Sequence, residues 1–148
     1  MKEILFKAKR TDNGEWIEGY LFDDGMLGEK RMFIGELVIA PYEGPIRGKW
    51  TVIANGFDEV DPDTICQFTG LCDKNGKKIW ENDILMAHLD ESYPEDATYE
   101  TVEWNINGWG TRENGSMDRE YLDKFDLEHF EVVGNIFDNK ELLQGEHK

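Results

Sequence analysis

The sequence has no apolar run approaching the ~18 residues of a membrane-spanning helix. Its first residues, Met1-Lys2-Glu3, do not lead into a signal peptide, and it has neither internal repeats nor low-complexity tracts. Hydrophobic residues make up 39% and aromatic residues 12% of the 148 positions, which is too many for a chain that is disordered by composition. We therefore expect a soluble, folded, cytoplasmic protein with no membrane partner.

Cysteine and histidine are scarce. The two cysteines, Cys66 and Cys72, and the three histidines, His88, His129 and His147, lack the short paired spacings of a four-ligand zinc site. Cys66 or Cys72 with His88 would supply the roles of a cysteine enzyme, but neither cysteine has a local signature that would activate it. No phosphate-binding glycine pattern occurs. We predict free thiols, one or both of them buried, and no catalytic residue, metal or cofactor.

Basic residues are outnumbered two to one. The chain has 32 acidic and 16 basic residues, and residues 79–148 alone carry a net charge of -13, against -1 for residues 1–50. Such a surface repels phosphate backbones, which argues against direct nucleic-acid binding unless the few basic residues of the first half gather on one face. The acidity either keeps the protein soluble or forms a face that docks a basic protein or mimics DNA.

Helical periodicity is also scarce, and strand-like alternation replaces it. Eight segments alternate with a period of about two or carry β-branched and aromatic runs: residues 4–9, 16–22, 32–40, 50–54, 65–68, 77–87, 102–106 and 130–136. Turns are expected at Asn55-Gly56 and, as a type I′ hairpin turn, at Asn75-Gly76. We predict loops at 88–98 and 112–119. Arg119–His129 has loose helical spacing, and a short closing helix is expected from Asp138 to Gln144.

These patterns predict a mainly β protein: a small antiparallel, barrel-like fold with an SH3-like character, about seven or eight short strands and a short C-terminal helix. A length of 148 residues is enough for one domain with its own core. We therefore expect a single domain over residues 1–148. The alternative is two small β subdomains that share a core.

Three segments together resemble the YopX family: TICQFTGLCDKNGKKIWENDIL at 64–85, EVVGNIFDNKELL at 131–143 and LFKAKRTDNGEWIEGYL at 5–21. Members of that family are small proteins carried by bacteriophages and prophages, mostly of Gram-positive bacteria, and no reaction is attached to them. The resemblance implies a mostly β structure with barrel-like character and a phage or prophage origin. It implies the bacterial host cell as the setting, and it supplies no catalytic residues.

Glu81 and Asp83 are the best candidates for chemistry, because residues two apart on a strand project from the same face. Two such carboxylates can share a proton or hold a divalent metal ion. The alternative is a solvated strand end at which Asp83 accepts backbone N–H bonds in a turn. Trp109, flanked by Gly108 and Gly110, either anchors a partner from an exposed loop or folds over the end of the barrel.

Taken together, these features favour a non-enzymatic binding or regulatory protein with an acidic surface. We expect it to contact a basic host or phage protein, with Trp109, Glu81 and Asp83 as candidate contact residues, and to form a homo-oligomer because its strand edges need covering. The alternative is a small metal-dependent or carboxylate-based hydrolase centred on Glu81 and Asp83.

Overall fold

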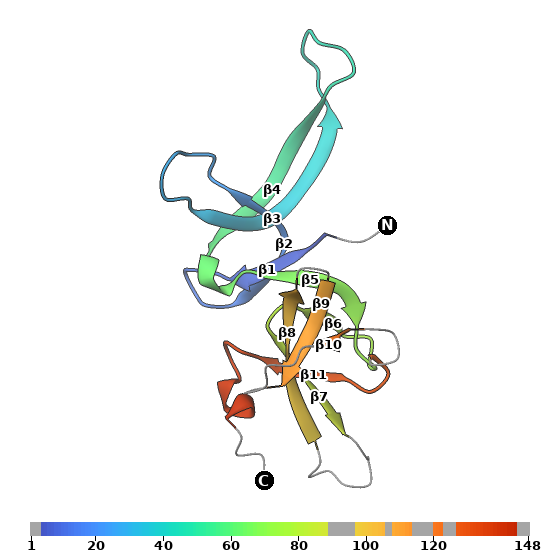
Figure 1. Ribbon diagram of the computed structural model, residues 1–148. Coiled ribbons are helices and arrows are strands. Elements are labelled where there is room, and N and C mark those ends of the chain that lie inside the picture. Colours follow the sequence, from blue (N-terminus) through green and yellow to red (C-terminus); the bar gives the residue numbers. More distant parts are fainter. Residues whose placement is uncertain (1–3, 89–96, 106–107, 114–119, 123–126, 145–148) are drawn as a thin grey trace. The chain divides into compact units, whose positions relative to one another are not determined.

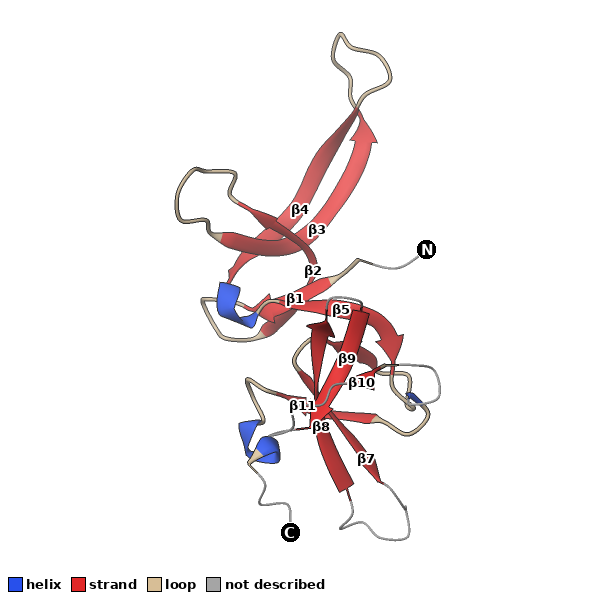
Figure 2. Ribbon diagram, viewed as in Figure 1, coloured by secondary structure: helices blue, strands red, loops and turns tan. Residues whose placement is uncertain are grey.

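The computed structural model describes residues 4–88, 97–105, 108–113, 120–122 and 127–144, and the regular secondary structure of these residues is almost all β-strand (Figures 1 and 2). The chain divides into two compact units. The N-terminal unit is Ile4–Gln67, and the C-terminal unit is Phe68–Lys148 together with Met1–Glu3. No helix among the described residues is long and apolar enough to cross a membrane.

The N-terminal unit is an antiparallel sheet with the neighbour order β4-β3-β2-β1-β5. Its strands are β1 (Phe6–Lys9), β2 (Trp16–Asp23), β3 (Met32–Pro41), β4 (Trp50–Val60) and the first residues of β5 (Cys66–Cys72). A 3₁₀ turn, η1 (Pro62–Thr64), precedes β5, and the carboxylate of Asp61 caps it by accepting the Asp63 N–H.

Ala8, Ile34 and Val60 form the buried centre of the N-terminal unit. Each comes from a different strand. Alternate residues of a strand point to the same face of the sheet, so several strands can contribute side chains to one cluster. Partly buried side chains surround this centre: Phe6, Ile17, Leu21, Met32 and Ile65.

The C-terminal unit contains the second half of β5, which pairs with β6 (Lys78–Trp80), and a five-stranded antiparallel sheet in the order β10-β9-β8-β7-β11. The strands of that sheet are β7 (Asp83–His88), β8 (Ala97–Asn105), β9 (Gly108–Glu113), β10 (Glu120–Tyr121) and β11 (Glu131–Asn135). Six buried side chains of this unit form one cluster: Ile79, Leu85, Val102, Trp109, Phe130 and Val132.

The mainly β, antiparallel prediction is confirmed, but three of its details are wrong. The sheets do not close into a barrel, and the described residues form eleven strands rather than seven or eight. The closing helix is only a 3₁₀ turn, η3 (Lys140–Leu143). Alternation along a strand reports which face is buried, but it contains no information on whether the first and last strands meet.

The loose helical spacing over Arg119–His129 does not give a helix at its start, where Glu120 and Tyr121 pair with Thr111 and Gly110 of β9, whereas Leu127 further along is helical. At Glu120 and Tyr121, strand pairing thus overrides the local spacing. Residues 123–126 of that segment, 89–96 of the predicted loop at 88–98 and 114–119 of the predicted loop at 112–119 lie outside the described residues. The remaining positions of those two loops are mostly strand: 97–98 in β8 and 112–113 in β9.

Asn55-Gly56 is not a turn, because β4 continues through it. Gly35 lies opposite Phe57 and Leu37 lies opposite Ala54, so β4 has one residue more than β3 across this step. Gly56 has φ +107°, which the extra residue of a β-bulge requires and which glycine adopts without strain. The Asn-Gly pair therefore marks a bulge here, whereas sequence reasoning assigned it to a reversal of the chain.

Candidate functional site in the C-terminal unit

The central hairpin is organised by the buried side chain of Asp73. Its Oδ1 accepts the N–H groups of Asn75 and Lys77, both at 2.9 Å. The Gly76 N–H closes the turn on the Asp73 carbonyl oxygen at 3.0 Å. Only Gly76 of the Asn-Gly pair has a positive φ, of 80°. The predicted type I′ turn is therefore wrong, and the chain uses the three-residue loop with a glycine bulge instead.

The same carboxylate holds the hairpin to a distant strand. Asp73 Oδ2 accepts the N–H of Val132 in β11 at 2.9 Å. Burial, the largest single influence, acts to raise the pKa of Asp73, but the N–H groups of Val132, Lys77 and Asn75, together with the charge of Lys77, lower that pKa by more. Asp73 is therefore a charged, buried residue that joins two of the three segments that carry the family resemblance.

Glu81 and Asp83 do not lie on one strand. Strand β6 ends at Trp80, the chain turns at Glu81 and Asn82, and β7 begins at Asp83. Asn82 has φ +69°, a left-handed conformation that asparagine tolerates better than most residues. The same-face argument for a carboxylate pair therefore fails, because the two residues are separated by a change of strand direction.

Asp83 has a structural position in that turn. It is 2% exposed, and its Oδ2 accepts the Trp80 N–H at 2.8 Å. The backbone bond of the alternative interpretation is thus present, but Asp83 is buried and does not form a solvated strand end. Glu81 remains half-buried beside it. The turn is also joined to its surroundings by backbone bonds of Asn82: its N–H donates to Val102 O at 2.8 Å and its O accepts from Ile136 N at 3.0 Å.

The closing segment is shaped by asparagine side chains. Asn135 Oδ1 accepts the N–H groups of Phe137 and Asp138 at 2.9 Å, and Asn139 Oδ1 accepts the Asn135 N–H at 3.1 Å. A Cβ on Gly134 would overlap the side chain of Asn139. The segment GNIFDN therefore needs glycine and both asparagines to bring η3 back against β8.

An open groove of about 540 Å³ lies where the Asn82 turn, β8, β9 and the closing segment meet. Its volume is in the range of small-molecule and side-chain pockets. Arg112 Nε and Glu103 Oε1 form an ion pair at 2.9 Å on its wall. The residues that line it are Asn82, Thr101, Glu103, Arg112, Ile136, Lys140, Leu143 and Gln144.

The groove combines a cation, an ion pair and two apolar side chains, which suits a contact with a mixed polar and apolar segment of another molecule. Sequence reasoning placed the candidate chemistry at Glu81 and Asp83, next to Asn82 on this groove, but missed Arg112 and Lys140. No local pattern pointed to those two residues. They become neighbours only because β9 pairs with β8 and η3 packs against β8.

Trp109 is 8% exposed and belongs to the buried cluster, so the structure places it in the core rather than on an exposed contact loop. It lies opposite Trp104 in the β8–β9 ladder, with ring centroids 5.0 Å apart and nearly perpendicular planes. Trp104 is 54% exposed. The exposed tryptophan at this end of the sheet is therefore Trp104, and the glycines around Trp109 allow close backbone approach: a Cβ on Gly110 would overlap Glu120 O.

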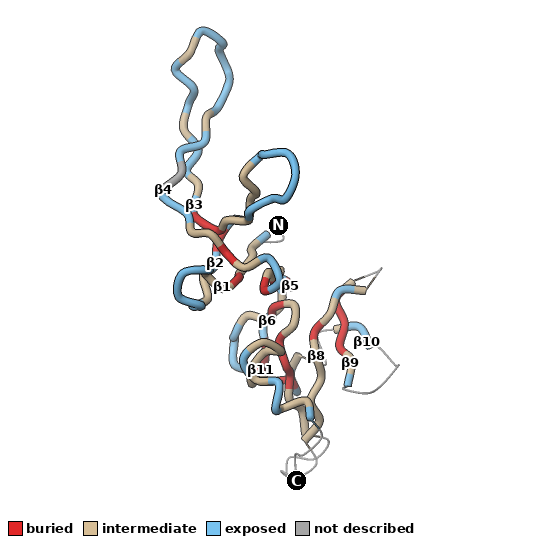
Figure 3. The backbone as a smooth tube through the Cα atoms, turned by 90° about the vertical axis from the view of Figure 1, so that its left-hand side faces the viewer, coloured by how far each residue is buried: buried red, intermediate tan, exposed pale blue. Residues whose placement is uncertain are grey.

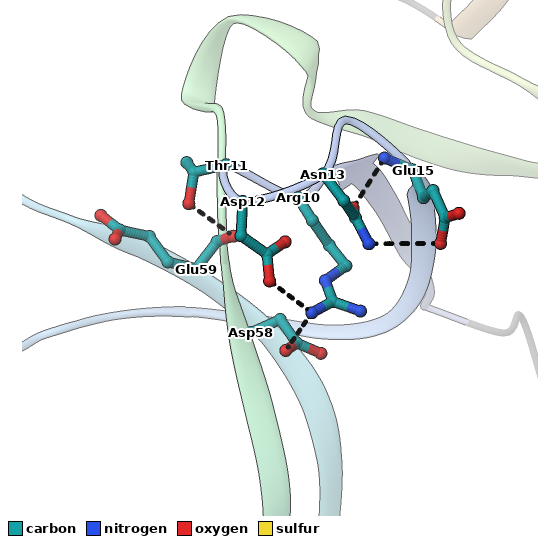
Figure 4. Close-up of polar contacts among 7 residues, drawn as sticks. All are labelled: Arg10, Thr11, Asp12, Asn13, Glu15, Asp58 and Glu59. Atoms are coloured by element: carbon teal, nitrogen blue, oxygen red, sulfur yellow. Dashed lines mark hydrogen bonds and ion pairs between the residues drawn. The ribbon is translucent and has the colours of Figure 1, made fainter.

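A separate polar cluster in the N-terminal unit holds the β1–β2 turn to the end of β4 (Figure 4). Arg10 Nη2 contacts Asp12 at 2.6 Å and Asp58 at 3.5 Å, and the Thr11 N–H donates to Glu59 O at 3.1 Å. Arg31 pairs with Glu59 through two bonds of 2.9 and 2.8 Å, which lower the pKa of Glu59. Arg10 and Arg31 are thus engaged with carboxylates.

The cysteines and histidines are dispersed. Cys66 is buried and donates to Thr64 O, and Cys72 is exposed; neither forms a disulfide bond. His88 ends β7, His129 is exposed, and His147 lies outside the described residues.

Comparison with known proteins places the chain in a family. The family model described as YopX protein matches residues 6–144, nearly the whole chain. The chain belongs to the YopX family. The resemblance seen in the central hairpin and the closing segment is thereby confirmed, and those are the two segments that Asp73 joins.

A similar fold is found among solved structures. The crystal structure of protein EF1440 from Enterococcus faecalis matches 97% of this chain and 100% of its own, with a TM-score of 0.66 and 22% sequence identity. At that identity the likeness concerns the fold. The comparison with curated proteins gave no match.

Proposed function

We propose that this chain is a phage- or prophage-derived binding protein of the bacterial cytoplasm, and that its C-terminal unit engages a basic host or phage protein. The observation that carries the proposal is that the carboxylates of this unit fall into a buried group and an exposed group. Those best shielded from water, Asp73 and Asp83, accept backbone bonds and hold turns. Others in the same unit are exposed: Glu113, Glu120, Glu128, Asp138 and Glu141.

The charge of the unit supports a basic partner. Residues 68–148 carry 19 acidic and eight basic residues, a net charge of -11, whereas residues 4–67 carry 12 acidic and seven basic, a net charge of -5. A surface of one sign attracts an oppositely charged partner and speeds its association. It also disfavours direct contact with nucleic acid.

The groove supports an apolar contact in addition to the attraction between charges. Ile136 and Leu143 offer apolar surface beside the Glu103–Arg112 ion pair and Lys140. A basic partner steered by the acidic surface would place an apolar side chain there and present its charges to the rim, the usual arrangement of an interface. Glu81 and Asp83 lie at the adjoining turn and Trp104 at the end of the same sheet. Partner contact by Glu81, Asp83 and Trp109 stays a prediction, and for Trp109 the contact would pass through Trp104.

The experiment is capture of the tagged protein from host lysate at low and moderate salt, followed by mass spectrometry. A variant with Glu113, Glu120 and Glu128 changed to Gln is compared with a control in which Glu18, Glu29 and Glu36 of the N-terminal unit are changed to Gln; all six are exposed. The proposal expects a basic protein that dissociates as salt rises and is lost with the first variant only. Exposed ion pairs of about 0.2–1 kcal/mol each predict a roughly 3- to 150-fold loss of affinity.

Equal loss with both variants, or the absence of any salt-sensitive basic partner, would contradict the proposal. A partner retained at high salt and lost on changing Leu143→Ser would instead identify an apolar contact in the groove.

A further inference from the structure

The outer part of the β3–β4 hairpin, Leu37–Ala54, extends past the strands that flank its base, and we call it the arm. Strand β2 pairs with β3 only from Met32 to Gly35. Beyond the bulge, residues Leu37–Pro41 pair only with Trp50–Ala54 within the described residues. Figure 3 shows this part of the N-terminal unit as mostly exposed or intermediate. The arm is thus a two-stranded ribbon, and no third strand from the described part of the chain pairs with it.

Both faces of the ribbon are apolar. Residues directly opposite share a face, so Ile39 and Val52 lie on one side and Val38 and Ile53 on the other. Their exposures are 65%, 57%, 44% and 50%, and Trp50 at the end of the ribbon is 68% exposed. Neither Leu37–Pro41 nor Trp50–Ala54 contains a charged residue. An isolated two-stranded ribbon is marginal in water, and apolar surface of this extent marks an interaction site.

We infer that the arm packs against the arm of a second copy of this chain. Charge selects the occupant. The chain carries -16, but residues 37–54 contain only Glu43, Arg47 and Lys49, a net charge of +1. The arm of a second copy can therefore approach this arm without the repulsion that two acidic surfaces would cause. A two-fold contact pairs each surface with itself, and Glu43 of one arm then finds Arg47 or Lys49 of the other as an oppositely charged neighbour.

The available area fits a stable interface. Taking roughly 200 Å² for a fully exposed large side chain, the five apolar residues of the ribbon together with Tyr42 and Ile46 of its loop, all about half-exposed, offer on the order of 700 Å² when both faces of the arm are counted. Each partner contributes about 800 Å² to an interface of standard size, so a contact of that size has to cover both faces of the arm. The open backbone edges of both strands add hydrogen-bonding groups that a second ribbon can pair. This inference concerns the N-terminal unit and is independent of the proposed function.

The test is the mass of the full chain by sedimentation equilibrium over a range of micromolar concentrations. The expected mass is a multiple of 17.2 kDa that persists at high salt, because an apolar contact is not screened. The variant Ile39→Glu/Val52→Lys removes apolar surface. It introduces a cross-strand ion pair and keeps the net charge unchanged, and it should lower the mass to 17.2 kDa. The control Met26→Lys/Leu27→Glu changes two exposed apolar residues outside the arm and should leave the mass unchanged.

A second variant, Val38→Glu/Ile53→Lys, tests the opposite face and replaces the first if circular dichroism shows that the first has lost its β-structure. Dissociation by either arm variant supports the inference. A wild-type mass of 17.2 kDa at every concentration overturns it, as does an oligomer that both folded arm variants retain. Monomers that bind lipid vesicles through the arm would overturn it in favour of a membrane contact.

Discussion

The carboxylate of Asp73 accepts the backbone N–H of Val132, which lies 59 residues further along the chain, at 2.9 Å. The bond joins the central hairpin to β11, so that a side chain in a tight turn fixes the position of the last strand. Because the same carboxylate also accepts two N–H groups of its own turn, one buried charge organises local and long-range structure together.

Changing Asp73→Asn should destabilise the C-terminal unit. An amide presents an NH₂ group where the carboxylate presented an oxygen, so at least one backbone N–H loses its acceptor in a buried position. A loss of about 2–4 kcal/mol lowers the Tm by roughly 5–15 °C, which thermal unfolding followed by tryptophan fluorescence measures. The exposed Glu128→Gln is the control, with no expected shift. A Tm within a degree of wild type would show that the three bonds do not hold the unit.

Stability should fall at acid pH, and Asp73 should account for part of the fall. Burial acts to raise its pKa, but three backbone donors lower it below the unfolded value of about 3.9. A group whose folded pKa is lowered stabilises the fold above its unfolded pKa and loses that contribution as the pH falls through the folded pKa. Urea unfolding of wild type and Asp73→Asn near pH 6 and near pH 3 should show a difference in free energy that shrinks at the lower pH. A difference that stays constant would assign the acid sensitivity to other carboxylates.

Divalent metal ions should leave the Tm unchanged. The hydrolase alternative needs Glu81 and Asp83 to face one ion, but the turn at Asn82 separates them and Asp83 is committed to the Trp80 N–H. Titration of Mg²⁺, Mn²⁺ and Ca²⁺ during thermal unfolding measures this directly, since an ion that binds only the folded state raises stability by RT ln(1 + [L]/Kd). A rise that disappears in Glu81→Gln/Asp83→Asn would restore the hydrolase as the leading interpretation.

Local patterns were enough for most of the strands. The alternation of Trp16–Phe22 and of Val102–Ile106 predicted strands that the structure contains over Trp16–Asp23 and, up to its last described residue Asn105, in β8. Local patterns were insufficient for turn geometry, because Asn-Gly tolerates a positive φ both in a hairpin turn and in a β-bulge. At Asn55-Gly56 only the pairing partners in β3 distinguish the two.

By itself the sequence determined that this protein is mainly antiparallel β, strongly acidic in its second half and a member of its family, because alternation, charge and local motifs are properties of neighbouring residues. Tertiary structure alone decided that Asp73 holds Val132, that Trp109 is buried while Trp104 is exposed, and that Asn82, Arg112 and Lys140 line one groove. Each of these depends on which distant strands pair, and that choice is made by the burial and hydrogen bonding of the whole unit.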